Sequence, residues 1–253
     1  MRRVKLIALG CLLISSQLVH AQKTDAVALD QKKNIVKVNL TALAFKNLSL
    51  QYERVTGRKT SFALGVGLMP KSKLPFAEKI RDEYGEDEDV KAALDQTRLN
   101  NFTITPEFRF YLGKQAPTGF YVAPFVRYAH AGFEGPYTFT PSDDQLHTAN
   151  IKGSINSVGG GLLLGAQWNL GKSVSLDWWI AGPIVGSTKG KLSGTDPKGI
   201  PAEDRPGIKE DIDSFDPPGL NFTSTVGANS IDVDIDGTYY GLRAFGICLG
   251  IKL

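Results

Sequence analysis

Residues 230–253 read SIDVDIDGTYYGLRAFGICLGIKL. Apolar side chains occupy most of the odd positions, and aspartate, glycine or another small or polar residue occupies most of the even ones. Because successive side chains of a β-strand point to opposite faces, this alternation predicts one long strand with a single apolar face. Strands of globular proteins usually have about 5–6 residues, whereas a tilted strand that spans a bilayer needs about 9–11. We therefore interpret this stretch as the closing strand of a transmembrane β-barrel.

The opposite end of the chain predicts export. Three basic residues lie within the first five, residues 6–18 are mostly apolar, and small residues precede a cleavage point after Ala21, which is the pattern of a signal peptide. We expect three segments: a signal peptide over 1–21, a polar tail over 22–34 and the barrel domain over 35–253.

The charge balance of the exported part argues against a nucleic-acid partner. The whole chain has a formal charge of +3, but residues 1–21 contain three basic residues and no acidic one, which leaves 26 of each sign. A basic nucleic-acid footprint is therefore absent. Cys248 is the single cysteine after residue 21, so the barrel domain cannot form an internal disulfide.

The lengths of the connections indicate the topology. The predicted strands cover 35–45, 48–55, 60–68, 101–112, 120–133, 154–168, 174–186 and 231–253. The connections after the second, fourth and sixth strands are tight, whereas those after the third, fifth and seventh are long, so the long ones fall at one end. Bacterial outer-membrane barrels have an even number of strands, short periplasmic turns and longer external loops. We predict an all-β, eight-stranded antiparallel up-and-down transmembrane β-barrel with long external loops, of which 69–100 is partly helical.

The polar face of each predicted strand points into the barrel. An eight-stranded barrel has room only for side chains, and an isolated buried charge is costly, so interior charges must pair. We predict an interior network that joins Glu53, Glu107 and Asp177 to Arg109 and Arg127. Two interpretations stay open: a plug that fills the barrel, or a gated pore or proton path.

The apolar face of each strand is predicted to meet lipid. Phe108, Leu164 and Leu249 should then point outward, while Glu107 stays enclosed. Arg243 lies about ten residues from the C-terminus, which corresponds to about 23 Å along the membrane normal in a tilted strand. We expect Arg243 at the outer interface, in contact with lipid phosphates.

Taken together, residues 35–253 resemble the small eight-stranded outer-membrane barrels of the OmpA/OmpX type, in the form common in Bacteroidota. The C-terminal strand carries the resemblance, although Leu253 stands where such proteins often have an aromatic residue. The resemblance implies a location in the cell outer membrane and recognition of this strand by the barrel-insertion machinery. We expect a monomer without an open pore, in contact with outer-membrane lipid and lipopolysaccharide. Its external loops would carry a structural, surface-interaction or adhesion role.

Two other function classes are considered. A lipid A-modifying enzyme would need a rim histidine such as His130, but no nucleophile signature accompanies it. A lipocalin-like barrel would place apolar residues inside around a ligand. Residues 232–237 match the start of a calcium loop, D-x-D-x-D-G, yet the twelfth position is Arg243 instead of glutamate. We predict no catalytic residue, no cofactor and no metal ligand.

Overall fold

The structure is a computed structural model that describes residues 32–75, 77–79, 94–139 and 147–253. The predicted signal peptide and most of the polar tail lie outside these residues. Residues Lys33–Leu253 form one compact unit. Its elements are β1 (Asn34–Asn39), α2 (Leu40–Ala44), β2 (Leu48–Val55), β3 (Thr60–Lys73), β4 (Arg98–Tyr111), β5 (Gly119–Phe139), β6 (His147–Leu170), β7 (Val174–Ala181), β8 (Pro183–Thr195), α5 (Arg205–Asp213), β9 (Leu220–Val226), β10 (Ser230–Leu242) and β11 (Gly246–Lys252).

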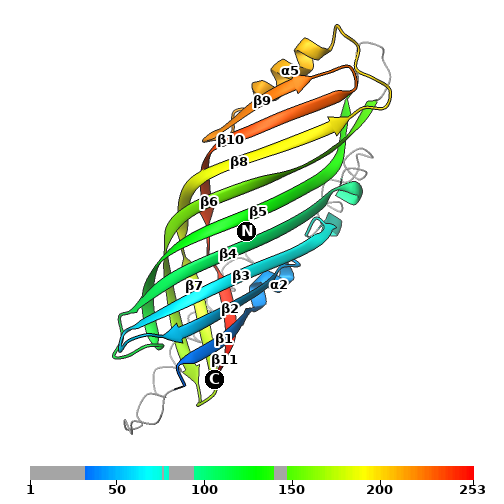
Figure 1. The fold of residues 1–253 in the computed structure, drawn as a ribbon. Coiled ribbons are helices and arrows are strands. Elements are labelled where there is room, and N and C mark those ends of the chain that lie inside the picture. Colours follow the sequence, from blue (N-terminus) through cyan, green and yellow to red (C-terminus); the bar gives the residue numbers. More distant parts are fainter. Residues whose placement is uncertain (1–31, 76, 80–93, 140–146) are drawn as a thin grey trace, which may run out of the picture. The chain divides into compact units, whose positions relative to one another are not determined.

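Eight of these strands close a barrel. They follow one another in the order β1, β2, β3, β4, β5, β6, β7 and β11, with β11 paired to β1 and every pair antiparallel (Figure 1). The seam between β11 and β1 pairs Val36 with Ile251, and the N–H of Leu253 donates to the carbonyl of Asn34 at 2.8 Å. The eight-stranded antiparallel barrel predicted from the sequence is confirmed.

Alternation along the strands gives the barrel an apolar outside and a mostly polar inside. Phe108, Leu164 and Leu249 are 37%, 47% and 40% exposed, whereas Glu107 and Arg109 are 2% and 0% exposed. The predicted orientation of these five residues is therefore correct. We call the outward apolar residues of the eight strands the apolar belt; it includes Val36, Leu50, Leu64, Val66, Leu68, Phe102, Phe108, Phe120, Leu162, Leu164, Trp178 and Leu249.

The first predicted strand is shorter than the sequence suggested. It ends at Asn39, and residues 40–44 form the helix α2 instead. The Asn39 side chain caps this helix by accepting a hydrogen bond from the Ala42 N–H at 3.1 Å. Because Leu and Ala are good helix formers, a capped turn competes successfully with the end of the strand. The apolar side chains of Leu40 and Leu43 remain exposed.

Two predicted strands are each interrupted at the same level of the barrel. The seventh strand divides at Gly182 into β7 and β8, and the closing strand divides between Leu242 and Gly246 into β10 and β11. The N–H of Arg243 donates to the Gly182 carbonyl at 2.8 Å, and Phe245 has a φ of 56°. An extra residue in a strand exchanges its two faces. The odd positions of 231–235, which the sequence predicted to face lipid, are therefore buried, and so is Ile184 on β8.

Above these interruptions the barrel wall continues as an open sheet, which we call the outer sheet. It consists of β8, β10, β9 and the first part of β6, paired antiparallel in the order β6, β8, β10, β9. Its buried face holds Ile231, Val233 and Ile235, which pack with Ile200. The helix α5 lies against β9 at one end of the molecule (Figure 1). Part of the predicted loop 187–229 is therefore regular structure, which its Gly- and Pro-rich sequence did not indicate.

The remaining long connections are only partly described. The sequence predicts helices at 76–84 and 89–99 within 69–100, and residues 77–79 and 94–96 are helical. Residue 97 has no regular structure, residues 98–99 belong to β4, and the rest of the two predicted helices lies outside the described residues. No helix among the described residues combines the length and apolar character that a membrane-crossing helix requires.

Candidate functional site

Asp177 on β7 is the centre of a buried ion-pair network inside the barrel. Its Oδ2 atom lies 2.6 Å from Nζ of Lys37 on β1 and 2.7 Å from Nη1 of Arg109 on β4. The hydroxyl of Tyr121 on β5 donates to the other oxygen, Oδ1, at 2.8 Å. All four side chains are at most 1% exposed. Four different strands are thus joined through one carboxylate.

Glu53 on β2 extends the network toward the neighbouring strands. Its carboxylate lies 2.5 Å from Nζ of Lys37 and accepts hydrogen bonds from the hydroxyls of Tyr111 at 2.6 Å and Ser61 at 2.5 Å. The amide oxygen of Gln167 accepts from Lys37 at 2.8 Å and lies 3.1 Å from the Tyr111 hydroxyl. Buried ions are stable only when such additional hydrogen bonds satisfy them.

Glu107 on β4 connects the network to the interruption in the closing strand. It forms ion pairs with Arg109, at 2.5 Å, and with Arg243. Arg243 is 3% exposed, and its guanidinium carbon lies 3.8 Å from the ring centre of Trp179, in a cation–π contact. The prediction that Arg243 contacts lipid at the outer interface is therefore wrong. The break between β10 and β11 turns this side chain inward.

Four of the five residues predicted for the network are brought together, and one is not. Arg127 donates to the hydroxyl of Thr105 at 3.0 Å and is only half-buried. Among the described residues no carboxylate forms an ion pair with Arg127. Lys37 and Arg243 take its place, so that three carboxylates face three cations.

Lys37 is a cation that the sequence prediction assigned to no site. It lies on the polar face of the first strand, at the position paired with Gln51 on β2. A lysine on an inward face of a narrow barrel is itself a signal, because it must find a carboxylate there. Which carboxylate it finds depends on the register around the barrel, which the sequence of one strand does not contain.

The network lies in a tightly packed part of the barrel interior. Aromatic and aliphatic residues pack around it, including Tyr111, Tyr121, Phe125, Leu163 and Trp179, all at most 6% exposed. A glycine completes the packing, since a Cβ atom on Gly165 would lie 2.3 Å from the Tyr121 ring. This interior contradicts the lipocalin-like alternative, which requires an apolar ligand cavity inside the barrel.

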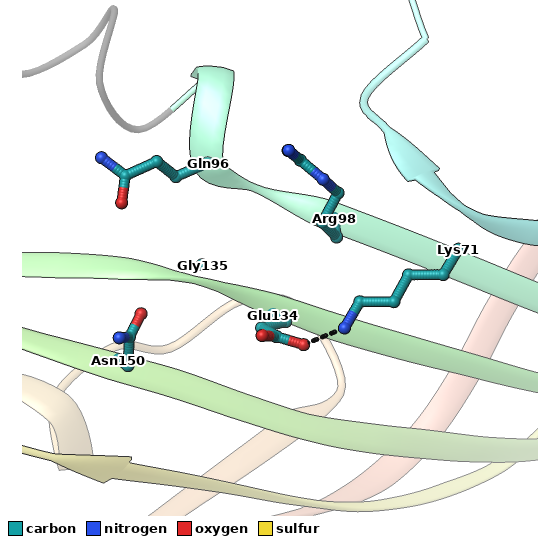
Figure 2. A pocket seen from close by; sticks show the side chains of 6 residues that line it. All are labelled: Lys71, Gln96, Arg98, Glu134, Gly135 and Asn150. Atoms are coloured by element: carbon teal, nitrogen blue, oxygen red, sulfur yellow. Dashed lines mark hydrogen bonds and ion pairs between the residues drawn. The ribbon is translucent and has the colours of Figure 1, made fainter.

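A second candidate site lies on the outside, at the end where the long connections gather. A depression of about 480 Å³ lies between the ends of β3, β4, β5 and β6. Figure 2 shows the side chains that line it. Lys71 reaches across β4 to form an ion pair with Glu134 on β5, whereas the Arg98 side chain on β4 is directed away from this pair. The other lining residues are Gln96, Gly135 and Asn150.

The two histidines of the barrel domain each contact a polar side chain. His130 contacts the amide oxygen of Asn156 through Nδ1 at 2.8 Å, and the Tyr128 hydroxyl donates to the same oxygen at 2.8 Å. His147, the first residue of β6, is buried, and its Nδ1 atom lies 2.5 Å from the carboxylate of Asp196, which directly follows β8. Among the described residues, no cluster of three or more His, Cys, Asp or Glu side chains could hold a metal ion.

Comparison with known families places this barrel in one of them. The model of DUF3575, described as a protein of unknown function, matches residues 7–186. The chain belongs to the DUF3575 family. The matched part of this DUF3575 protein ends within β8, so it includes Lys37, Glu53, Glu107, Arg109 and Asp177 but not the closing strand.

One solved structure is similar to this DUF3575 protein, at low sequence identity. A structure search finds the translocator domain of the autotransporter NalP from Neisseria meningitidis, with 10% sequence identity and a TM-score of 0.32. That match covers 89% of this chain and 90% of the other. No curated protein matches the sequence.

Proposed function

We propose that this protein is an outer-membrane β-barrel, closed to solutes by its interior ion-pair network, with a structural or surface-interaction role at its outer end. One observation carries the proposal: the apolar belt surrounds an interior that holds six paired charges. Water would favour the reverse arrangement, because burying a Leu or Phe side chain is worth about 1.5–3 kcal/mol. Hydrocarbon around the barrel removes the cost of exposing the belt.

The connections support an orientation in the membrane. Bacterial barrels have short turns on the periplasmic side and longer loops outside. The connections 56–59, 112–118 and 171–173 are short, and they lie at the end of the barrel where β1 begins and β11 ends. The outer sheet and α5 lie at the other end. This supports an external position for the outer sheet, at the end where OmpA/OmpX-type barrels carry their long loops.

The outer sheet has the surface of a water-exposed structure. Lys191 and Asp234 form an exposed ion pair at 2.8 Å across β8 and β10, and the Ser193 hydroxyl donates to Asp232 at 2.6 Å. The hydrogen bond to Asp234 raises the pKa of Lys191. Charged outward faces replace the apolar belt here, which supports a position beyond the lipid and a role in contacts at the cell surface.

Location in the outer membrane can be tested with the full chain expressed with its own N-terminus in a Gram-negative host. We expect it in the outer-membrane fraction, with faster gel mobility before boiling than after. Leu249→Arg places a charge in the belt and should cost about 2–4 kcal/mol of folding free energy. Thr225→Arg, on an exposed position of β9, is the matched control and should have little effect. A protein that is soluble without detergent, and that tolerates Leu249→Arg, would overturn the proposal.

Closure of the barrel has a separate test. Purified protein in planar bilayers should show no steady ion conductance at moderate voltage. Removing the packing around the network, by Tyr111→Ala together with Tyr121→Ala, should produce conductance. Steady conductance of the unmodified barrel would contradict the closed interior while leaving its membrane location intact.

A further inference from the structure

The depression in Figure 2 lies just beyond the apolar belt. On β3 and β4, Leu68 and Phe102 are paired and are the last belt residues before the outer end. Arg98 lies four residues further along β4, on the same outward face, paired with Glu134. Four residues correspond to about 13 Å of strand, or about 9 Å along the barrel axis at a tilt near 45°. In the proposed membrane orientation this is the level of the lipid headgroups.

Three cations lie next to Glu134 among the described side chains. Glu134 is paired across β5 and β6 with Lys152, and across β4 and β5 with Arg98, and it forms an ion pair with Lys71. Its hydrogen bond and charge interaction with Lys71 lower its pKa, and Lys152 and Arg98 contribute to the shift. Among the residues that the structure describes, Glu134 is thus a carboxylate that interacts with three cations. No described carboxylate forms an ion pair with Lys152 or Arg98.

Arg98 is held in place by the backbone instead. Its Nη1 atom donates to the carbonyls of Asp95 at 2.6 Å and Thr97 at 3.1 Å. These bonds orient the guanidinium without neutralising it. The side-chain amides of Gln96 and Asn150 lie at the same depression and add neutral donors (Figure 2).

We infer that this depression, lined by Lys71, Arg98 and Glu134 and flanked by Lys152, the cross-strand partner of Glu134, binds a phosphate group of an outer-leaflet lipid, of the kind carried by lipid A. Arginine and lysine are the side chains that recognise phosphate, and basic pockets at the headgroup level of membrane proteins bind anionic headgroups. The inference rests on the proposed membrane location and names a site for the expected contact with lipopolysaccharide. Glu134 competes with the phosphate for Lys71.

Because of this competition, substitutions of the cations and of Glu134 should change the affinity for the lipid in opposite directions. The full-length protein, purified in a neutral detergent, is titrated with fluorescent lipid A that carries both phosphates and with the dephosphorylated form. We expect the phosphorylated lipid to bind at least about tenfold more tightly. Lys71→Gln, Arg98→Gln and Lys152→Gln should each weaken its binding by about three- to tenfold. Glu134→Gln should tighten it, because the substitution releases Lys71.

Matched controls separate the site from general electrostatics. Lys172→Gln removes a lysine from the exposed turn at the opposite end and should leave binding unchanged. Millimolar inorganic phosphate should compete only weakly if the ligand is the lipid, and fully if the site takes free phosphate, which would overturn the assignment to a lipid. Equal binding of the two lipid forms would overturn the inference, as would a Glu134→Gln variant that keeps its heat-modifiable mobility but binds more weakly. Failure of the proposed function would show differently, as protein absent from the outer membrane.

Discussion

The ammonium of Lys37 and the carboxylate of Asp177 lie 2.6 Å apart inside the barrel, although 140 residues separate them in the chain. The two residues come from β1 and β7, which are not neighbours, because β11 lies between these strands. Their contact crosses the interior behind β11, at the level where Cys248 pairs with Asp177. The last strand, β11, is thus hydrogen-bonded to β1 and β7, and the Lys37–Asp177 ion pair additionally links these two neighbours on the interior side.

Removing Lys37 should destabilise the barrel strongly. Lys37→Met leaves Glu53 and Asp177 buried with one fewer cation, and breaking a buried pair in this way costs about 3–5 kcal/mol. Urea unfolding in lipid vesicles, followed by tryptophan fluorescence, measures the loss. Adding Asp177→Asn restores the charge balance and should recover part of it. The control Lys172→Met should stay within about 0.5 kcal/mol of the unmodified protein, and a Lys37→Met variant that is equally stable would contradict the network.

A double-mutant cycle should show that Arg243 acts inside the barrel. We expect Arg243→Met and Glu107→Gln each to destabilise the protein, with a coupling free energy of about 1–3 kcal/mol between them. Arg54→Met, at an exposed position on β2, should show no coupling to Glu107→Gln. A coupling free energy near zero between Arg243→Met and Glu107→Gln, measured by the same unfolding experiment, would contradict the interior position of Arg243. It would favour the lipid interface predicted from the sequence.

Protonation of Asp213 should loosen α5 from β9. The Asp213 carboxylate accepts from Nζ of Lys209 at 2.5 Å and from the hydroxyl and N–H of Ser224 at 2.8 and 2.6 Å. These hydrogen bonds, that of Lys209 first, lower its pKa below the ordinary value of 3.8. A lowered folded-state pKa stabilises the contact above the ordinary value, and the stabilisation is lost as the pH falls through the folded-state pKa.

The measurement is hydrogen exchange at the Ser224 amide, corrected for intrinsic exchange, at neutral pH and below pH 3.8. Protection should fall at the lower pH. Asp213→Asn should show weak protection at both values, whereas Asp211→Asn, an exposed change on the same helix, should behave like the unmodified protein. Unchanged protection in Asp213→Asn would mean that the carboxylate does not hold α5 in place.

The same contact should protect the edge of the outer sheet from pairing with another chain. Lys209 donates to the Ser224 carbonyl at 2.7 Å while Asp213 accepts from its N–H, so both backbone groups of this residue on β9 are occupied. Exposed strand edges are templates for association. Lys209→Ala combined with Asp213→Ala should increase self-association, detected by light scattering after chromatography. Glu210→Ala with Asp211→Ala is the control, and equal behaviour of the two pairs would refute edge protection.

Much of the barrel could be predicted from local pattern. The alternation in Phe62, Leu64, Val66 and Leu68 against Ser61, Ala63, Gly65 and Gly67 follows from the two-residue period of a strand, which needs no knowledge of the partner strands. The same holds for the enclosure of Glu53, Glu107, Arg109 and Asp177. Short and long connections alternate along the chain, and this order alone indicates an up-and-down barrel.

The pairing of interior charges could not be predicted in the same way. Lys37 and Arg243 join the network because register and strand order bring their side chains to the level of Glu53 and Glu107. The break near Arg243 has no marker stronger than the neighbouring glycines, yet it exchanges the faces of the strand. One inserted residue reverses every assignment beyond it, which is why Ile231, Val233 and Ile235 belong to the core of the outer sheet instead of the apolar belt.

The sequence by itself therefore determined which side of each regular strand is apolar and that the chain closes into an eight-stranded barrel, because strand periodicity is a local property. Only the tertiary structure decided which charges meet, where β7 and β10 are interrupted, and that α5 covers β9. These features depend on contacts between residues far apart in the chain, whose positions are set by the register of the whole barrel.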